Sequence, residues 1–335
     1  MSHKIWITWE DHRRSRELST AFSAKYVFLS CNRSRIIRYP VLGAKTFKLL
    51  LSEKPSLVFC QNPSIVLTSL LCILKIFFKY SLIVDRHSNF KFHTSKSMNP
   101  KWIIFHWLSK LSLRRADLTI VTNQFLKSYI ESCGGKSEIL PDKLPSLKSA
   151  NPQKLLGRVN YVFVSTFSED EPIHELLAAA KMIENSKNIY ITGNHKKYRD
   201  IDKITSNLPS NVTLTGFLSE EDYQDLLHSA DVVIVITTQE YTLTCGAYEA
   251  VSLEKPMILG DTQTIREYFF SGALYTSSLP SDLAEKIEAA GNQLSSLRDG
   301  VVALKATLIE TWNDQFKEVQ KQIADIEGRH KKRAL

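Results

Sequence analysis

Short apolar runs rich in β-branched residues alternate with helix-like segments along almost the whole chain. This alternation constrains the fold more than any other feature of the sequence. The first strand-like runs cover residues 4–9, 26–30, 56–60, 82–85 and 117–122. Runs of this length that are separated by helices predict a parallel sheet covered on both faces. The sequence therefore predicts an α/β protein.

The alternation breaks between residues 133 and 160, where the chain holds a Gly-Gly pair, the sequence PDKLP and a late glycine. Such a stretch is typical of a linker. Further strand-like runs follow at 161–165, 188–192, 212–215, 231–237 and 256–259. A chain of 335 residues is long enough for two domains of ordinary size.

These patterns divide the chain into three parts. We expect an N-terminal domain over residues 1–145, a C-terminal domain over residues 146–310, and a terminal helix with a basic tail over residues 311–335 that returns to the N-terminal lobe. The composition is that of an ordinary globular protein, with 43% hydrophobic and 23% charged residues, which excludes wholesale disorder.

Charge is distributed unevenly between the two halves of the chain. Residues 1–150 contain 24 Lys and Arg against 9 Asp and Glu, whereas residues 151–335 contain 19 against 26. Such asymmetry predicts that the first half binds an anionic partner, which could be nucleic acid, an anionic membrane surface or a phosphate-bearing substrate. A basic surface that only faces solvent is the plain alternative. Nucleic acid is disfavoured because no known nucleic-acid-binding motif is present.

Two stretches of the first half combine apolar and basic residues. Residues 63–80 contain an apolar run that Lys75 interrupts, and this run is shorter than the ~20 residues of a membrane span, so we expect a buried core helix. Residues 91–115 mix lysines and arginines with tryptophans, isoleucines and leucines. Such a mixture suits either in-plane contact with a membrane surface or an amphipathic helix that packs on a sheet.

The five cysteines are scattered, and neither they nor the nine histidines show the spacing of metal ligands. We therefore expect no disulfide framework, no metal and no cofactor. The N-terminal residues also lack the apolar region of a signal peptide, so we expect a protein of the reducing cytoplasm.

Polar residues that directly follow strands are the best candidates for a site, because ligands of open parallel sheets lie beyond the carboxyl ends of the strands. The richest example is the segment from Thr237 to Glu249, where a very apolar strand leads into a turn of small residues and then a helix. The first free N–H groups of a helix bind anions. Glu249 would lie near the start of this helix, where a carboxylate can accept hydrogen bonds from a vicinal diol such as ribose.

The segment from Asp231 to Asp261 resembles the donor site of GT-B nucleotide-sugar glycosyltransferases, above all the family-4-type bacterial enzymes. The resemblance rests on Tyr248-Glu249-Ala250, on the following Glu254-Lys255-Pro256-Met257-Ile258, and on Asn211 to Phe217, which precedes the base site in that family. It implies GT-B architecture, with two Rossmann-like domains facing a cleft. It also implies that the N-terminal domain binds the acceptor and the C-terminal domain the nucleotide sugar.

The resemblance assigns residues to the donor side. The family's first glutamate corresponds to position 241, which is Tyr here, so the neighbouring Glu240 is its candidate equivalent and a catalytic candidate. After the first strand of the C-terminal domain, the family's Gly and basic pair are replaced by Ser165, Thr166 and an acidic run. The remaining candidates for donor binding are Gly193, Lys196, Phe217, Thr242, Thr244, Cys245, Gly246 and Glu249.

On the acceptor side, the strand-end sequence Asp85-Arg86-His87 lies where the resemblance places an acid or base group. Asp85 and His87 are the catalytic candidates, because an inverting enzyme needs a general base on the acceptor hydroxyl. Arg86, Glu10 and Asp11 are further acceptor-side candidates. Two of these residues have a purely structural alternative: Asp85 could cap the segment that follows it, and His87 could be a satisfied core or turn histidine.

These expectations combine into one function. The sequence predicts a hexosyltransferase that moves a sugar from a UDP- or GDP-linked donor to a glycan or lipid-linked acceptor in bacterial surface polysaccharide synthesis, at the inner face of the plasma membrane. The alternatives are a GT-B nucleotide-sugar epimerase, which acts on soluble substrate alone, and a non-catalytic two-lobed binding protein.

Overall fold

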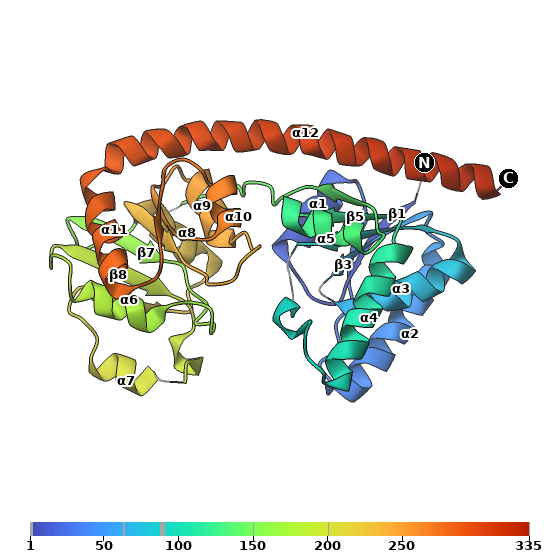
Figure 1. Ribbon diagram of the computed structural model, residues 1–335, viewed down its shortest axis with the longest axis horizontal. Helices are drawn as coiled ribbons and strands as arrows, with labels where there is room; N and C mark the ends of the chain where they lie inside the picture. Colours follow the sequence, from blue (N-terminus) through green and yellow to red (C-terminus); the bar gives the residue numbers. More distant parts are fainter. Residues whose placement is uncertain (1–2, 63, 88–90, 150, 200, 335) are drawn as a thin grey trace. The chain divides into compact units, whose positions relative to one another are not determined.

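The computed structural model of the chain describes residues 3–62, 64–87, 91–149, 151–199 and 201–334. The chain forms two compact units. The first unit consists of residues 1–143 and 311–335, and the second consists of residues 144–310. Each unit is built on a six-stranded sheet in which every strand pairing is parallel (Figure 1). Two α/β units with parallel sheets confirm the predicted fold class.

The sheet of the first unit has the strand order β2-β1-β3-β4-β5-β6. Its elements are β1 (Lys4–Thr8), α1 (Arg13–Ala21), β2 (Lys25–Phe28), α2 (Arg35–Glu53), β3 (Leu57–Asn62), α3 (Ile65–Phe78), β4 (Ser81–Arg86), the 3₁₀ turn η1 (Phe92–Thr94), α4 (Pro100–Arg115), β5 (Leu118–Val121), α5 (Gln124–Ser132) and β6 (Ser137–Ile139).

Alternate residues of these strands bury against different helices. On one face of the sheet, Ile5 and Val58 pack with Leu42 of α2 and Leu71 of α3. On the other face, Trp6 and its neighbours pack with α1 and with the last part of the chain. Strands that are buried on both faces contain continuous apolar runs, here residues 57–60 of β3 and 82–84 of β4, which is why both strands are recognisable in the sequence.

The sheet of the second unit has the strand order β12-β11-β10-β7-β8-β9. Its elements are β7 (Val159–Phe163), α6 (Ile173–Ala180), β8 (Lys187–Thr192), the 3₁₀ turn η2 (His195–Lys197), α7 (Ile201–Ser206), β9 (Val212–Gly216), α8 (Glu220–Ser229), β10 (Val232–Val235), α9 (Cys245–Ser252), β11 (Met257–Gly260), α10 (Gln263–Tyr268), β12 (Ala273–Thr276) and α11 (Pro280–Asn292).

The strand order of the second unit reverses between β7 and β10. From β7 the chain moves outward to β8 and β9, and it then returns to the other side of β7 to form β10, β11 and β12. Loops that leave neighbouring strands at such a switch point diverge to opposite faces of the sheet and leave room for a ligand. A ligand site is therefore expected at the segments that follow β7 and β10.

The last helix, α12 (Leu294–Ala334), contributes to the cores of both units. Val301, Leu304 and Leu308 are buried with residues of the second unit. Farther along the same helix, Trp312 and Val319 are buried with residues of the first unit. The helix is drawn in red in Figure 1.

Some boundaries differ from the predicted ones. The segment expected as a linker contains β6. The apolar segment around α3, expected to be a buried core helix, buries only one side, because Ile73, Ile76 and Phe77 are exposed. Within the described residues, no helix combines the length and the apolar character that crossing a membrane demands.

Candidate functional site

The segments that follow β7 and β10 lie side by side at the switch point of the second unit. The hydroxyl of Thr237 donates a hydrogen bond of 2.6 Å to a carboxylate oxygen of Asp170, and the backbone N–H of Thr238 donates to the Asp170 carbonyl. The two loops are therefore joined by hydrogen bonds at the carboxyl edge of the sheet. This is where an open parallel sheet binds its ligand.

Helix α9 begins directly against this edge. Gly246 is buried, and a Cβ atom in its place would lie 3.0 Å from side chains of Val164 and Val235. This glycine therefore lets the first turn of α9 approach the ends of β7 and β10 closely. Thr244 occupies the N-cap position without making a side-chain cap, and its buried hydroxyl has no hydrogen-bond partner among the described residues. An N-cap hydroxyl in this state can donate to an anion at the helix end.

Glu249 lies in α9 and is only 6% exposed. Its carboxylate accepts a hydrogen bond of 2.5 Å from the hydroxyl of Tyr223, which lies on α8. A buried carboxylate needs such partners, because removal from water is costly for a charge. Tyr223 thus fixes the position of the carboxylate, a pairing that no sequence motif indicates.

The acidic run after β7 forms a closed network around its own loop. The carboxylate of Glu171 accepts hydrogen bonds from the hydroxyls of Ser165 and Thr166, at 2.6 and 2.9 Å. It also accepts from the backbone N–H groups of Thr166 and Ser168, at 3.0 and 3.3 Å. Glu171 therefore occupies donors that would otherwise face solvent or a bound anion, among them the predicted donor-binding groups of Ser165 and Thr166.

The other predicted donor-side residues lie in the loops around this edge. Gly193 has a φ of +103°, and a Cβ there would lie 2.3 Å from the Ser165 carbonyl oxygen, so the position requires glycine. Phe217 is 83% exposed directly after β9. Among the remaining residues, Lys196 lies in η2 and is exposed. In the turn before α9, Glu240 is exposed and Thr242 is half-buried, and the exposed Cys245 is the first residue of α9.

The first unit holds a buried ion-pair network at the end of β4. Arg14 of α1 donates hydrogen bonds to both carboxylate oxygens of Asp85, at 2.8 to 3.1 Å. Its guanidinium also donates to Asp142 at 2.6 Å and to the Leu140 carbonyl at 2.8 Å. Burial acts to raise the pKa of Asp85, but the adjacent Arg14 charge outweighs burial and holds this pKa well below its usual range. Asp85 therefore remains ionised and is no proton acceptor at neutral pH.

Two histidines lie beside this network. The Nδ1 atom of His87 is 3.4 Å from a carboxylate oxygen of Asp85, and the ring of His87 stacks on that of His12 at 4.9 Å. His12 caps α1, where its Nδ1 accepts from the backbone N–H of Arg14. Burial, and then the neighbouring His87, lower the pKa of His12. The structure therefore joins the predicted Asp85 and His87, and it adds Arg14 and His12, which sequence reasoning missed.

The other acceptor-side candidates lie apart from these histidines. Arg86 points to the opposite face of the sheet, where it is 5% exposed, donates to the Ser109 hydroxyl and lies over the ring of Tyr129. Glu10 and Asp11 follow β1 and are exposed. Asp11 accepts hydrogen bonds from Arg16 and Tyr26.

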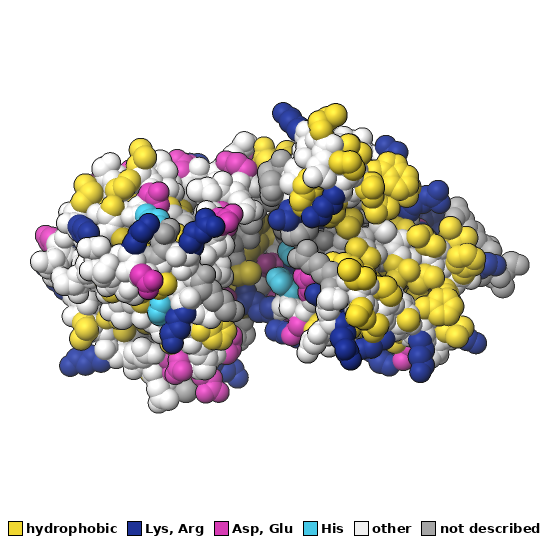
Figure 2. All heavy atoms as spheres, turned by 90° about the horizontal axis from the view of Figure 1, so that it is seen from below, with side chains coloured by type: hydrophobic (Ala, Val, Ile, Leu, Met, Phe, Trp, Pro, Cys, Tyr) yellow, Lys and Arg dark blue, Asp and Glu magenta, His cyan; other side chains and the backbone are white. Residues whose placement is uncertain are grey.

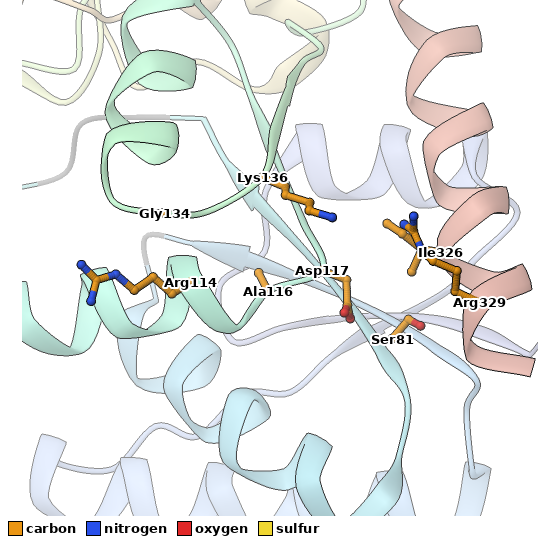
Figure 3. Close-up of a pocket in the computed structure, with 8 residues that line it drawn as sticks. All are labelled: Ser81, Arg114, Ala116, Asp117, Gly134, Lys136, Ile326 and Arg329. Carbon is orange, nitrogen blue, oxygen red and sulfur yellow. The ribbon is translucent and has the colours of Figure 1, made fainter. Parts of the chain in front are cut away.

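A separate pocket of about 310 Å³ lies at the amino ends of the strands in the first unit. Figure 3 shows residues at the starts of β4, β5 and β6, including Ser81, Asp117 and Lys136, together with Arg329 of α12. This is the edge of the sheet opposite to Asp85 and His87. In the part of the chain that the structure covers, no three His, Cys, Asp or Glu side chains gather closely enough to hold a metal ion.

Comparison with known proteins supports the fold and names a family. Residues 158–292, which make up most of the second unit, match the family described as "Glycosyl transferases group 1". A search of the curated proteins finds no match.

Several solved structures are similar over nearly the whole chain. Alr3699/HepE from Anabaena, in complex with UDP and glucose, has a TM-score of 0.73 at 14% identity, over 94% of this chain and 91% of that one. A sucrose-phosphate synthase from Thermosynechococcus elongatus has a TM-score of 0.72 at 14% identity, over 95% and 86%. A putative UDP-N-acetylglucosamine 2-epimerase from Listeria monocytogenes has a TM-score of 0.62 at 10% identity, over 94% and 97%.

These similarities extend across both units, whereas the family match lies within the second. The architecture is the GT-B architecture that the sequence resemblance predicted. Within this architecture, residues 158–292 of the second unit match the group 1 glycosyltransferase family.

Proposed function

We propose that the chain transfers a hexose from a UDP-sugar to a glycan or lipid-linked acceptor in the synthesis of a bacterial surface polysaccharide. The choice of UDP over GDP is supported by the similar Anabaena structures, which were determined with UDP and with UDP-glucose. The acceptor class is supported by the basic first unit, which suits an acceptor carrying a lipid diphosphate, and we place the reaction at the inner face of the plasma membrane.

In this proposal, the second unit binds the donor at the start of α9. The diphosphate accepts hydrogen bonds from the first N–H groups of the helix, at Cys245 and Gly246, and from the hydroxyls of Thr242 and Thr244. Glu249 accepts hydrogen bonds from the two ribose hydroxyls. The observation that carries the proposal is the buried Glu249 carboxylate, which Tyr223 holds beside a helix start whose N-cap hydroxyl has no hydrogen-bond partner among the residues that the structure describes.

The leaving group explains why the start of α9 matters for the rate. As the bond between the sugar C1 and the diphosphate breaks, negative charge accumulates on the diphosphate and the sugar acquires oxocarbenium character. Fixed donors that face the growing charge stabilise this transition state without having to reorganise. The partial positive charge of the helix N-terminus acts in the same direction. Lys196, in η2 after β8, is the predicted source of a full positive charge on the donor side.

The first unit supplies the acceptor side. We propose His87 as the general base that takes the proton of the acceptor hydroxyl while its oxygen attacks C1, with UDP as the leaving group. Asp85 remains an anion beside the Nδ1 atom of His87 and stabilises the imidazolium that forms. Asp85 is therefore a positioning residue in this scheme, and His12 holds the imidazole ring from its other side.

Calorimetric titration with UDP and GDP tests the donor site. Glu249→Gln should weaken UDP binding about tenfold or more, because hydrogen bonds to charged groups contribute about 1.5–3 kcal/mol. Glu220→Gln on the exposed surface of α8 is the control and should leave affinity unchanged. Unchanged affinity in the Glu249 variant would remove that residue from the site.

A transfer assay tests the acceptor side and separates the enzyme classes. His87→Gln should abolish transfer to a bacterial membrane extract while UDP affinity is retained. Conversion of the UDP-sugar to its epimer in the absence of any acceptor would instead favour the epimerase, whose structural likeness is also substantial. Full transfer activity in the His87 variant would contradict its role as base.

A further inference from the structure

The helices that cover one face of the first sheet carry many apolar side chains on their outer surfaces. In the described part of the chain, thirteen of the twenty-two large hydrophobic side chains that are exposed lie on α2, α3 and α4. We call these thirteen the three-helix face. They are Ile36, Ile37, Tyr39, Phe47, Leu51, Val66, Ile73, Ile76, Phe77, Ile103, Ile104, Trp107 and Leu111.

The three helices form one continuous surface. Helix α3 contacts both α2 and α4. The rings of Phe47 on α2 and Phe78 on α3 meet edge to face at 5.4 Å. Between α3 and α4, the Sγ atom of Cys72 lies 3.7 Å from the Ser112 carbonyl oxygen. Figure 2 shows hydrophobic side chains gathered over the first unit, at the right, with lysines and arginines along its edge.

The exposed apolar residues are additional to the side that each helix buries. Each helix already buries another side against the sheet, through residues such as Leu42 of α2 and Leu71 of α3. The outer residues Ile73, Ile76 and Phe77 are 57%, 64% and 73% exposed, and Trp107 is 62% exposed. A contiguous apolar surface of this kind on a soluble unit marks an interaction site.

The charge around the three-helix face selects its partner. Residues 35–115 contain 14 Lys and Arg but only two acidic residues. Of these two, Asp85 is buried against Arg14, and Glu53 is bonded to Lys25. Exposed cations on the three helices include Lys45, Lys48, Lys101, Lys110 and Arg114.

Lysines are depleted in protein–protein interfaces, and two copies of this surface would repel one another. Apolar side chains that enter the headgroup layer beside lysines that meet lipid phosphates match an anionic bilayer.

A groove on the three-helix face is a further feature that suits a lipid partner. A cavity of about 170 Å³ lies between α3 and α4, and its lining includes Ile73, Ile76, Leu108, Leu111 and Arg115. Aliphatic walls with one cation among them suit a segment of an acyl chain below its phosphate.

We propose that the three-helix face binds in plane on an anionic lipid bilayer, with Ile76, Phe77 and Trp107 inserted among the headgroups. The choice of a bilayer as partner rests on the proposed function, which brings a lipid-linked acceptor to the first unit. Bound in this way, the first unit would meet its acceptor by diffusion along the membrane surface.

Flotation of the full chain with vesicles tests the proposal. We expect binding to phosphatidylcholine vesicles that contain phosphatidylglycerol, weak binding to phosphatidylcholine alone, and a large loss in high salt, since surface charge is then screened. Ile76→Ser with Phe77→Ser should weaken binding to the anionic vesicles more than about tenfold. Met182→Ser, which removes a side chain of similar exposure from the second unit, should leave vesicle binding unchanged.

Flotation and UDP titration of the wild-type chain separate this proposal from the donor site. A wild-type chain that binds UDP but does not bind the anionic vesicles would overturn the bilayer contact and leave the proposed function standing. Vesicle binding without UDP binding would support the bilayer contact and overturn the donor site. A dimer in solution that the Ile76 and Phe77 substitutions dissociate would assign the three-helix face to a second copy of the chain and overturn the bilayer as its partner.

Discussion

At the scale of single residues, Arg14 determines what Asp85 can do. A carboxylate at a strand end beside a histidine resembles an acid–base pair in the sequence. In the structure, a buried guanidinium holds both oxygens of that carboxylate, so the residue remains an anion. The nearby imidazole is then the group that can accept a proton, and the carboxylate becomes the group that orients it.

Asp85→Asn should lower the free energy of unfolding of the first unit by about 3 kcal/mol at neutral pH, because it leaves a buried guanidinium without one of its two carboxylate partners. The low native pKa of Asp85 stabilises the fold above the unfolded pKa of about 3.9, and this contribution disappears as the pH falls through the native value. Urea titrations at neutral and acidic pH should therefore show a difference from the wild type that shrinks in acid.

Asp11→Asn provides the control for this measurement. It removes the partner of Arg16 in an ion pair whose side chains are 45% and 52% exposed. Pairs of this kind contribute about 0–1 kcal/mol. An equal loss of stability in the two variants would show that the Arg14–Asp85 pair is no more important than a surface pair.

Glu171 is the second residue whose role depends on its surroundings. Its carboxylate fills the loop after β7 and places a negative charge at the sheet edge where we propose that the donor diphosphate binds. Glu171→Gln should raise UDP affinity several-fold, because it removes a repulsive charge. It should also lower stability by about 1–2 kcal/mol, because the hydrogen bonds to the loop weaken.

Calorimetry and thermal unfolding measure these two effects together. Glu169→Gln, at an exposed position two residues earlier, changes the net charge by the same amount and should alter both quantities little. Weaker UDP binding in the Glu171 variant would mean that this carboxylate contacts the donor instead of repelling it.

At the scale of elements, α12 shows how one helix can complete a sheet from a distance in the sequence. The indole of Trp312 donates to the Pro141 carbonyl at 3.1 Å and stacks on Phe316 at 4.9 Å. Val319, Ile323 and Ile326 continue the buried stripe against Trp6 and its neighbours. This stripe covers a face of the first sheet that α1 does not cover alone.

Trp312→Ala should therefore destabilise the first unit by about 3–5 kcal/mol, the usual cost of removing a buried large aromatic ring. The urea midpoint of the first unit measures the effect. Ile309→Ala, at a 46% exposed position on the same helix, should change stability by no more than about 0.5 kcal/mol. A stable Trp312 variant would contradict a core role for the second half of α12.

The long elements could be predicted from the sequence, whereas several short ones could not. Strands such as β3 and β4 contain continuous apolar runs, at residues 57–60 and 82–84, because both faces of the sheet are covered, and this leaves a clear pattern. The strand-like runs of the sequence do not include β6 and β12. β6 has only three residues, one of them a glutamate, and β12 is mostly half-buried, so neither forms a continuous apolar run. Such short strands form because a neighbouring strand already offers hydrogen bonds, and local sequence does not contain that information.

At the scale of the whole molecule, the same division applies to the candidate site. The position of the motif predicted that Glu249 lies near the start of a helix that follows a strand, because strand ends and helix starts can be recognised in the sequence. Its partner Tyr223 lies 26 residues away, and the Arg14–Asp85 pair spans 71 residues. Pairings over such separations come from the fold. A surface-like arginine in a polar helix gives no local sign that it will be buried.

The two structural units also differ in net charge. The first unit, including the end of α12, has 29 Lys and Arg against 13 Asp and Glu, and the second unit has 14 against 22. The two units therefore carry net charges of opposite sign. The cationic unit contains the three-helix face, and the anionic unit contains the start of α9.

Because the last 25 residues belong to the first unit, the two lobes are not separable by a single cut. An engineer who grafts a foreign N-terminal lobe at position 143 must also replace the chain from position 311 onward. Otherwise the remaining part of α12 would not be complementary to the core of the grafted lobe. Evolution by domain shuffling faces the same requirement, so exchange of N-terminal lobes would need two coordinated crossovers.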